Sequence, residues 1–434
     1  MPRPRARQPL NVFLNGRLVG RLTKHTGGAI DFLYHESWLS WDNALPVSLS
    51  LPLREDRYTG RAVAALFDNL LPDSDEIRRR LAARVRAQGN DAYSLLAAIG
   101  RDCVGALQFL PDDIQPDPAG RVEGRPLKDK AIADILGDLN RTPLGVTGED
   151  EFRISIAGAQ EKTALLWWNG KWHVPRGATA TTHILKPQIG QRGDLDLSQS
   201  VENEHLCMRL AAALGLPTAR TEIVDFKGKR ALVVERFDRR WTGDHRLLRL
   251  PQEDCCQALS VPPTLKYQSV GGPGMIDILQ LLKGSDDPEH DRTVFMKAQI
   301  VFWLLGATDG HAKNFSIHLS PGGRFRMTPL YDVMSAQPSV DAGQIRYNKM
   351  KFALAVGKSR HYVIDTIRPR HFIQTGEAAG IPASLTQHIM AELLAQAPTA
   401  LEQTWRELSP TFPEGIFNAI RHGILHRLGK IQFG

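Results

Sequence analysis

Residues 301–332 limit the possible folds of this 434-residue chain more than any other stretch. Apolar residues between 294 and 305 recur at helical spacing, which predicts a helix that buries an apolar stripe and ends at Gly306. Residues 315–319 then alternate between apolar and polar, and a Pro-Gly-Gly turn at 321–323 leads to a second apolar run. Such alternation is typical of half-buried strands in a hairpin. We therefore expect a core helix followed by a rigid hairpin.

Three polar side chains flank the predicted hairpin: Asp309 and Asn314 precede it, and Asp332 follows it. Phosphoryl transfer from ATP uses these residue types in this order. One Asp takes the proton of the acceptor, an Asn five residues later holds metal, and a second Asp holds Mg²⁺ against the phosphates. The spacing alone is also expected by chance in a chain of this length. A kinase is therefore indicated only if other segments contain the remaining residues of a phosphoryl-transfer site.

Two upstream segments carry charged residues that a kinase site needs. The strand predicted for 182–187 contains Lys186, and the helix predicted for 200–214 carries Glu204 at one edge of its apolar stripe. Glu202, at the other edge, is the competing candidate. Kinases hold the phosphate-binding lysine with a helix glutamate. A solvated lysine near a strand end is the alternative interpretation.

A loop of small residues, 157–162, lies between the strands predicted for 152–156 and 163–168. Small residues let backbone amides approach a phosphate, although an ordinary hairpin loop would look similar because only one glycine is present. The apolar run at 231–234 predicts a buried strand. It leads into a segment placed where two-lobed kinases pair their backbone with adenine.

Composition excludes several classes of protein. With 42% hydrophobic and 23% charged residues, the chain has the composition of a globular protein. We expect neither a transmembrane helix nor a secretory signal, because no apolar run is long enough. Four cysteines without metal-type spacing indicate a reducing, cytoplasmic setting. The net charge of +7 suits a polyanionic partner, but an ordinary solvated surface explains it as well.

The pattern of apolar runs and turns changes along the chain and predicts its division into parts. An Asn-Gly turn at 15–16 predicts a hairpin, and Ser74 is placed to cap a helix over 76–88. Prolines and glycines in 111–128 indicate a linker. The expected parts are an α+β N-terminal subdomain (1–112), a linker with a short helix (113–150), a strand-rich nucleotide-binding lobe (151–258) and a helical lobe that carries the catalytic loop (259–434).

Longer blocks of the sequence resemble the HipA family, the kinase toxins of HipA/HipB toxin–antitoxin pairs. The blocks span essentially the whole chain in the family's order: FDNLLPDS, FRISIAGAQEKTALL, THILKP, NEHLCMRLA, VERFDRRW, LPQEDCCQ, KYQSVGGPG, GATDGHAKNFS and LYDVMSA. The resemblance implies an α+β fold, a two-lobed variant of the protein-kinase fold with an N-terminal subdomain and a helical C-terminal lobe. The chain lacks the His-Arg-Asp and Asp-Phe-Gly triplets of ordinary kinases, as members of this family do.

The same resemblance implies roles for individual residues. Asp309 is implied as the catalytic base, Asn314 and Asp332 as the magnesium ligands, and Lys186 as the phosphate-binding lysine supported by Glu204. Ser155 matches the serine whose autophosphorylation shuts the kinase off. The implied ATP site consists of Ala157, Gly158, Ala159, Gln160, Glu161, Lys162, Lys186, Glu235, Arg236, Phe237, His311, Lys313, Asn314, Tyr331 and Asp332.

The implied activity is that of an ATP- and Mg²⁺-dependent serine/threonine protein kinase that arrests growth as a toxin in persistence. Glutamate-tRNA ligase is its implied protein substrate. A dimeric, DNA-binding, HipB-like antitoxin is the implied partner, and through it the chain would act as a co-repressor on operator DNA at the nucleoid. The basic residues Arg368 and Arg370 are candidates for DNA contacts, and a solvated surface is the alternative interpretation.

Two other functions have to be weighed. A catalytically inactive co-repressor scaffold would be expected to lack Asp309, Lys186 or Asp332, and all three are present. A metal-dependent phosphohydrolase could use Asp309, His311, His318 and Asp332. Metal sites of that kind usually gather more ligands, and they need no lysine on an upstream strand.

Overall fold

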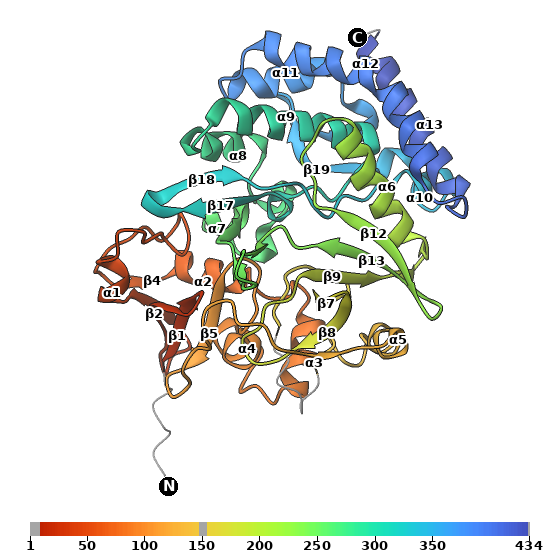
Figure 1. Ribbon diagram of the computed structural model, residues 1–434. Coiled ribbons are helices and arrows are strands. Elements are labelled where there is room, and N and C mark those ends of the chain that lie inside the picture. The colour runs from red at the N-terminus through yellow and green to blue at the C-terminus, as the bar shows by residue number, and fades with distance from the viewer. Residues whose placement is uncertain (1–8, 147–153, 433–434) are drawn as a thin grey trace.

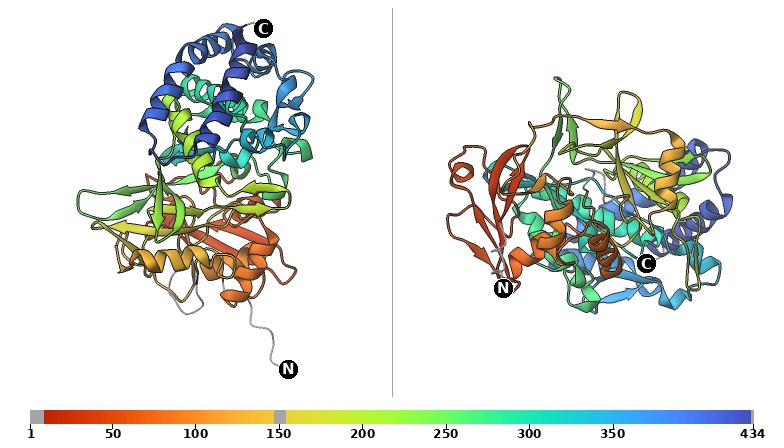
Figure 2. Two further views of the ribbon diagram at one scale, coloured as in Figure 1. Left: turned by 90° about the vertical axis from the view of Figure 1, so that its right-hand side faces the viewer. Right: turned by 90° about the horizontal axis from the view of Figure 1, so that it is seen from below.

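The computed structural model describes residues 9–146 and 154–432. Two antiparallel sheets occupy the lower half of the molecule in Figure 1, and a helical part lies above them. The view from the side shows the same separation, with the C-terminal helices at the opposite end from the N-terminus (Figure 2).

The N-terminal region forms a five-stranded antiparallel sheet in the order β4-β3-β2-β1-β5. Its strands are β1 (Leu10–Leu14), β2 (Arg17–Lys24), β3 (Ile30–Tyr34), β4 (Tyr58–Thr59) and β5 (Leu107–Pro111). Its helices are α1 (Glu36–Leu39), α2 (Arg61–Asp68), α3 (Asp75–Arg84) and α4 (Ala92–Ile99). The hairpin predicted at Asn15–Gly16 joins β1 to β2. Ser74 caps α3 through a hydrogen bond from the Ile77 N–H, but the helix ends four residues before the predicted position 88.

The second sheet has six antiparallel strands in the order β12-β13-β9-β7-β8-β6. They are β6 (Gly124–Pro126), β7 (Thr163–Trp168), β8 (Lys171–Pro175), β9 (His183–Pro187), β12 (Thr221–Phe226) and β13 (Lys229–Glu235). Helix α5 (Asp129–Gly137) packs against β12 and β13, and helix α6 (Ser200–Ala213) packs against the same two strands. Two short hairpins flank this sheet: β10 (Gly190–Arg192) with β11 (Leu195–Leu197), and β14 (Arg239–Trp241) with β15 (Leu247–Arg249).

The structure changes two local predictions in this region. The stretch 111–128, predicted as a linker, contributes β6 to the edge of the six-stranded sheet, where it pairs with β8. Of the strand predicted for 152–156, residues 152 and 153 lie outside the described residues. Ile154 forms only an isolated bridge with Asp102, so this segment joins the N-terminal region instead of the six-stranded sheet. The boundaries at 112, 150 and 258 stay predictions.

The C-terminal part is mainly helical, as expected, with two small sheets, β16-β17-β18 and β19-β20. Its α-helices are α7 (Cys255–Ala258), α8 (Met275–Leu281), α9 (Pro288–Leu305), α10 (Gln337–Asp341), α11 (Pro369–Ala378), α12 (Ala383–Glu407) and α13 (Glu414–Gln432). Its strands are β16 (Gln252–Asp254), β17 (Ser316–Ser320), β18 (Arg324–Met327), β19 (Lys351–Val356) and β20 (His361–Val363). Its 3₁₀ turns are η1 (Pro263–Leu265), η2 (Gln268–Val270), η3 (Leu282–Gly284), η4 (Ala312–Asn314), η5 (Pro321–Gly323), η6 (Tyr347–Lys349) and η7 (Ile364–Thr366).

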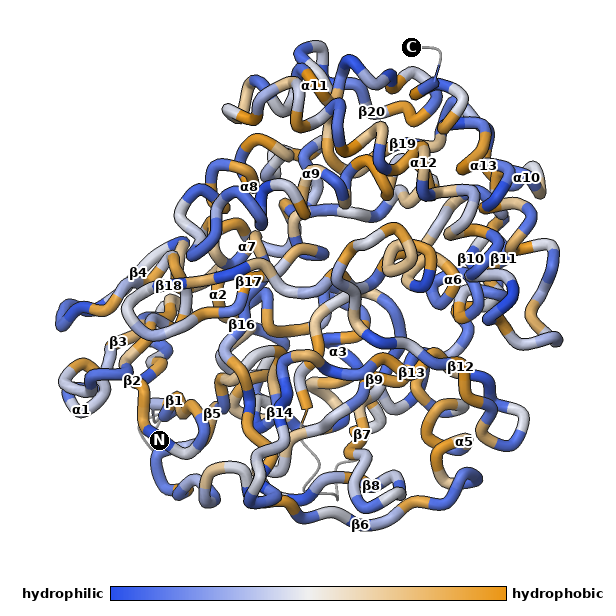
Figure 3. Tube along the Cα trace, turned by 45° about the horizontal axis from the view of Figure 1, so that its top comes forward, coloured by the Kyte–Doolittle hydropathy of each residue, from blue (hydrophilic) through white to orange (hydrophobic). Residues whose placement is uncertain are grey.

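Helix α9 lies within the helical part and leads into the loop that carries Asp309 and Asn314. Every residue from 295 to 305 is buried, so the helix is enclosed on all sides and not only along the predicted stripe. Gly306 ends it with φ +68°, a left-handed conformation that glycine adopts without strain. On α12 and α13, by contrast, hydrophobic and hydrophilic residues alternate (Figure 3). None of the described helices is both long and apolar enough to cross a membrane.

Candidate active site

A cavity of about 340 Å³ collects side chains from three separate parts of the chain. The six-stranded sheet and the segment that follows Ile154 supply one wall, and the loop after α9 supplies another. The N-terminal region contributes the third, through Asn69, Asp73 and Val104. All of the residues predicted for the ATP site line this cavity except Glu161. The Glu161 carboxylate instead pairs with Arg80 at 2.7 Å.

Lys186 is the central cation of the cavity. Its Nζ lies 2.8 Å from Glu204 Oε1 and 2.6 Å from Asp332 Oδ1, and its side chain is 6% exposed. Glu202, the competing candidate, pairs with Arg230 and does not reach the lysine. Burial alone would lower the pKa of Lys186, but the two carboxylates outweigh it and raise the pKa above its ordinary value. The lysine therefore stays charged at neutral pH.

Asp332 follows the β17–β18 hairpin and adopts φ +60°, a strained conformation for a residue with a side chain. Burial alone would raise the pKa of Asp332, but the ammonium groups of Lys186 and Lys162 hold that pKa well below its usual range. The group is therefore a permanent anion. Asn314, in η4, places its Nδ2 3.5 Å from Asp332 Oδ2.

The residues present fit a magnesium ion. Asn314 Oδ1 is buried and has no hydrogen-bond partner among the described residues, which is unusual for a buried amide oxygen. The Asn314 side chain lies beside the anionic Asp332, and Mg²⁺ prefers such oxygen ligands together with those of phosphates and water. In the described ranges no three His, Cys, Asp or Glu side chains gather so as to hold a metal by themselves. The phosphohydrolase alternative needs such a set, and its His318 lies instead against the ring of Phe237.

Asp309 lies at the mouth of the cavity, with 59% of its side chain exposed. The Tyr267 hydroxyl donates a hydrogen bond to Asp309 Oδ1, and the His311 ring packs edge-on against the Tyr267 ring. Partial burial raises the pKa of Asp309, the Tyr267 hydroxyl lowers it, and the Asp332 carboxylate raises it further. Burial lowers the pKa of His311 to about 3, so His311 is a neutral neighbour and not a competing acid.

The loop predicted to cover the phosphates folds back on itself. Gly158 adopts φ +108°, and a side chain at this position would collide with Lys162 Nζ. Lys162 donates to the Ala157 carbonyl at 2.8 Å. Burial and the neighbouring Lys186 lower the pKa of Lys162 to about 8. The loop thus adds a second, more easily deprotonated ammonium group to the cavity.

The segment after β13 lies in the cavity wall at the position predicted for the adenine connector. The backbone N–H groups of Glu235 and Arg236 donate to Arg220 and Thr182. The Phe237 ring packs against Tyr331, whose hydroxyl donates to the Lys313 carbonyl at 2.8 Å. The guanidinium of Arg236 is buried among protein groups and is therefore not available to a nucleotide.

Several residues of the cavity wall were not singled out from the sequence. Lys313 Nζ bonds to Asn69 and to Asp254, and Lys266 Nζ lies 2.8 Å from Asp73. Asn69 and Asp73 belong to the FDNLLPDS block, so membership of a family-specific block was the one signal that marked them. Lys266 and Asp73 are 193 positions apart in sequence, and Lys313 and Asn69 are 244 positions apart, a separation that local patterns do not reveal.

Ser155, Arg368 and Arg370 lie outside this cavity. Ser155 is fully buried, and its hydroxyl donates to the Leu70 carbonyl of the N-terminal region at 2.7 Å. Arg370 is exposed, whereas Arg368 is half-buried and donates to the Asp365 and Ile367 carbonyls.

Fold and site together define the class as a protein-kinase-like phosphotransferase. Residues 154–401 match the HipA-like C-terminal domain, and residues 10–110 match the HipA N-terminal domain. The chain therefore belongs to the HipA family and is a serine/threonine protein kinase of that family. This confirms the predicted family and enzyme class.

Three relatives illustrate the relationship. Y4mE of Sinorhizobium fredii, which is named as a kinase, is 40% identical over 80% of this chain and 81% of its own. The serine/threonine-protein kinase toxin HipA of Shewanella oneidensis is 27% identical over 92% of this chain and 90% of its own. A solved complex of Shewanella oneidensis HipA, HipB and operator DNA matches with a TM-score of 0.81, at 24% identity over 98% of both chains. The structural match confirms the predicted α+β, two-lobed fold.

Proposed function

We propose that the cavity binds ATP with Mg²⁺ and transfers the terminal phosphate to a serine or threonine hydroxyl of a protein. One observation supports this most directly: Lys186, Asp332 and Asn314 converge in one cavity, and Asn314 Oδ1 has no hydrogen-bond partner in the described part of the chain. Kinase use of ATP follows from the family, and the individual roles below are our assignment.

In this assignment Asn314 and Asp332 hold the metal, which when bound neutralises charge on the phosphates. Lys186, oriented by Glu204, binds the phosphates, and the loop 157–162 covers them. Asp309 accepts the proton of the acceptor hydroxyl. The adenine ring of ATP lies against the connector. The Phe237 N–H has no partner among the described residues there and is free to donate to this ring.

The test is incubation of the purified chain with Mg²⁺ and ATP labelled at the γ-phosphate, with and without glutamate-tRNA ligase. Label on the ligase or on the chain supports a kinase, and the ligase is the substrate we propose. Release of free phosphate at a comparable rate would favour the hydrolase. Absence of both products, with ATP still bound, would favour an inactive co-repressor scaffold.

We also propose that Ser155 is the autophosphorylation site and that its phosphate shuts the kinase off. The Ser155 hydroxyl is buried against Leu70, so modification requires the segment to leave the N-terminal region. A phosphate adds about −1.5 to −2 charges at neutral pH, which a buried site cannot accept. Intact mass after expression, followed by peptide mapping, locates the phosphate.

The biological role we propose is that of a growth-arresting toxin restrained by a HipB-like dimeric antitoxin. The solved Shewanella oneidensis complex consists of HipA, HipB and operator DNA, and this chain shares the fold of its HipA. We place the chain in the cytoplasm, and at the nucleoid when it is bound to the antitoxin as a co-repressor. Induced expression with and without a co-expressed HipB-like antitoxin tests the growth arrest.

Arg368 and Arg370 are proposed to contact DNA phosphates in that complex. Phosphate contacts orient a protein on DNA but do not specify sequence. Replacing both arginines with glutamine should therefore weaken ternary binding equally on operator and on mutated operator, with a shallower salt dependence. A gel-shift series checks this, and strong operator-specific binding by the chain alone would contradict the role given to the antitoxin.

A further inference from the structure

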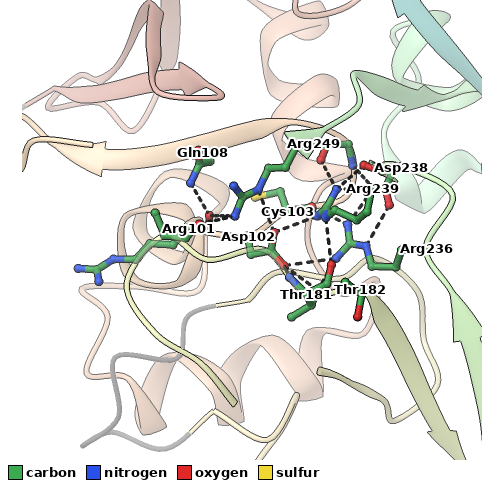
Figure 4. Close-up of polar contacts among 12 residues, drawn as sticks. Arg101, Asp102, Cys103, Gln108, Thr181, Thr182, Arg236, Asp238, Arg239 and Arg249 are labelled. Carbon is green, nitrogen blue, oxygen red and sulfur yellow. Dashed lines mark hydrogen bonds and ion pairs between the residues drawn. The ribbon is translucent and has the colours of Figure 1, made fainter. Parts of the chain in front are cut away.

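A buried ionic network lies directly behind the proposed adenine connector (Figure 4). Its charged members are Asp102, Arg236, Asp238, Arg239 and Arg249, and each of these side chains is at most 5% exposed. Two carboxylates thus face three guanidinium groups away from water. Buried charges are costly unless every one is paired, so this many at one place calls for an explanation.

The network ties the N-terminal region to the connector. Asp102 Oδ1 lies 2.9 Å from Arg239 Nη2 and 3.0 Å from Arg249 Nε, and Asp102 Oδ2 accepts from the N–H and hydroxyl of Thr181. Asp238 accepts from both Nε and Nη2 of Arg236. The excess positive charge is met by backbone carbonyls, including that of Cys103, which accepts from Arg236 and Arg239.

The contacts that involve backbone atoms fix the course of the loop Asp102–Gly105. The Gly105 N–H donates to Asp238 Oδ2 at 2.7 Å, and the Gly105 carbonyl accepts from Arg239 Nη1 at 2.8 Å. Gly105 has φ +74°, and a side chain there would collide with the Gln252 carbonyl. The loop is therefore clamped on both sides of Val104, and Val104 is half-buried and lines the same cavity as Phe237 and Arg236.

We propose that the loop Asp102–Gly105 is a specificity-determining part of the nucleotide site. In it, Val104 forms a wall of the pocket for the adenine base. Asp102 is a positioning residue that fixes this wall relative to the connector. The inference rests on the proposed ATP site. It assigns the N-terminal region a direct share in nucleotide binding. Burial raises the cost of leaving any member of the network unpaired, so the loop has little freedom to move away.

Val104 variants test the wall without disturbing a charge. Val104→Phe should fill the base pocket and raise the KM for ATP and the dissociation constant for adenosine about tenfold or more, because extra volume in a packed wall has to be accommodated. Affinity for inorganic tripolyphosphate, which has no base, should not change. Val104→Ala should weaken the binding of adenosine to a smaller extent. Equal losses for adenosine and tripolyphosphate would overturn the wall assignment.

Asp102→Asn tests the positioning role. It should raise the KM for ATP several-fold with a smaller effect on kcat once ATP is saturating, whereas Asp102→Glu should restore part of the loss. Asp291→Asn is the matched control: Asp291 is also buried, with Ser285 and Arg326 as partners, but lies outside the cavity. The control should lower the melting temperature without moving the KM for ATP.

The outcomes separate the two proposals. If the wild-type chain binds neither ATP nor adenosine, the proposed function fails. If the wild type binds both, and Val104→Phe and Asp102→Asn bind them equally well, only the assignment of the loop fails. If Asp102→Asn does not fold, the comparison of adenosine with tripolyphosphate in the Val104 variants still decides the question.

Discussion

In the proposed mechanism Asp309 accepts the proton, and its carboxylate is exposed at the cavity mouth while Lys186 and Glu204 lie deeper. Asp309→Asn keeps the shape of the side chain but removes its ability to accept a proton. We expect kcat to fall by about 10² to 10⁴, with the dissociation constant for Mg²⁺ATP unchanged within about twofold. Labelled-ATP kinetics and calorimetry measure the two quantities. A near wild-type kcat would show that Asp309 is not the base.

Tyr267 shifts the pKa of Asp309 through its hydroxyl. The hydrogen bond from Tyr267 lowers the pKa of Asp309, against burial and Asp332, which raise it. Tyr267→Phe therefore leaves Asp309 with a higher pKa, so the carboxylate stays protonated up to a higher pH. We expect the acidic limb of the kcat/KM profile to move to higher pH, with activity above that limb largely retained. A profile that falls uniformly, or a limb that moves to lower pH, would contradict this role.

The sequence alone predicts those site residues that lie close together along the chain in a recognisable order. Asp309, Asn314 and Asp332 flank one hairpin, and their spacing survives in any correct fold. Asn69 and Asp73 could not be placed in this way, because they meet the catalytic loop only after distant segments pack together. For Arg236 the position in the connector was predicted, but the direction of the side chain was not. The side chain points into a buried ionic network that no local pattern describes.

At the scale of elements, the segment from Ile154 to Gly158 packs on the N-terminal region and carries Ser155, the proposed autophosphorylation site. It is held to the N-terminal region by hydrogen bonds from the Ser155 N–H to Asp102 and from the Asp73 N–H to Gly158. Ser155→Asp puts a carboxylate, which cannot donate, against the Leu70 carbonyl in a fully buried place. We expect the segment to detach and the affinity for ATP to fall at least tenfold, as measured by calorimetry.

Ser155→Ala is the control for that prediction. It removes one hydrogen bond, worth about 1 kcal/mol, and introduces no charge. ATP affinity should therefore be retained while the mapped phosphate disappears. An aspartate variant with unchanged ATP affinity, together with a phosphate found elsewhere, would remove Ser155 from the proposed role.

Elements with strong periodicity or clear end signals were predicted closely. Helix α9 ends at Gly306 and β7 has the predicted bounds, since a long apolar run and a left-handed glycine leave little choice. The three-residue strands β6 and β16 were not expected, because so short a strand has no period of its own and exists only through its partner. The segment at Ile154 was likewise not predictable from its own sequence, because its extended backbone pairs with Asp102 of the N-terminal region.

At the scale of the whole molecule, the N-terminal region and the helical part are joined through Glu253 on β16. This side chain is fully buried, and its Oε1 accepts from the Leu49 N–H at 2.8 Å, while Oε2 has no partner among the described residues. Burial raises the pKa of Glu253 from 4.5 to about 8. The carboxyl is therefore protonated in the folded protein at neutral pH.

The pH dependence of stability follows from this shift. A carboxyl that binds its proton more tightly when folded stabilises the fold fully below its unfolded value of 4.5, and the stabilisation is lost as the pH rises through about 8. Over that window the loss is about 1.4 kcal/mol per pH unit. Glu253→Gln resembles the protonated form at every pH. Its melting temperature should match the wild type near pH 5 and exceed it increasingly towards pH 8.

The comparison of the two proteins isolates this one group, because all other titrating residues are shared. Glu377→Gln, at an exposed position on α11, is the matched control and should follow the wild-type curve throughout. Differential scanning calorimetry at several pH values between 5 and 9 provides the measurement. Parallel curves for the wild type and Glu253→Gln would mean that Glu253 titrates as an ordinary glutamate. Since the Glu253 carboxyl accepts a hydrogen bond from the Leu49 N–H, that result would also show that this contact opens in solution.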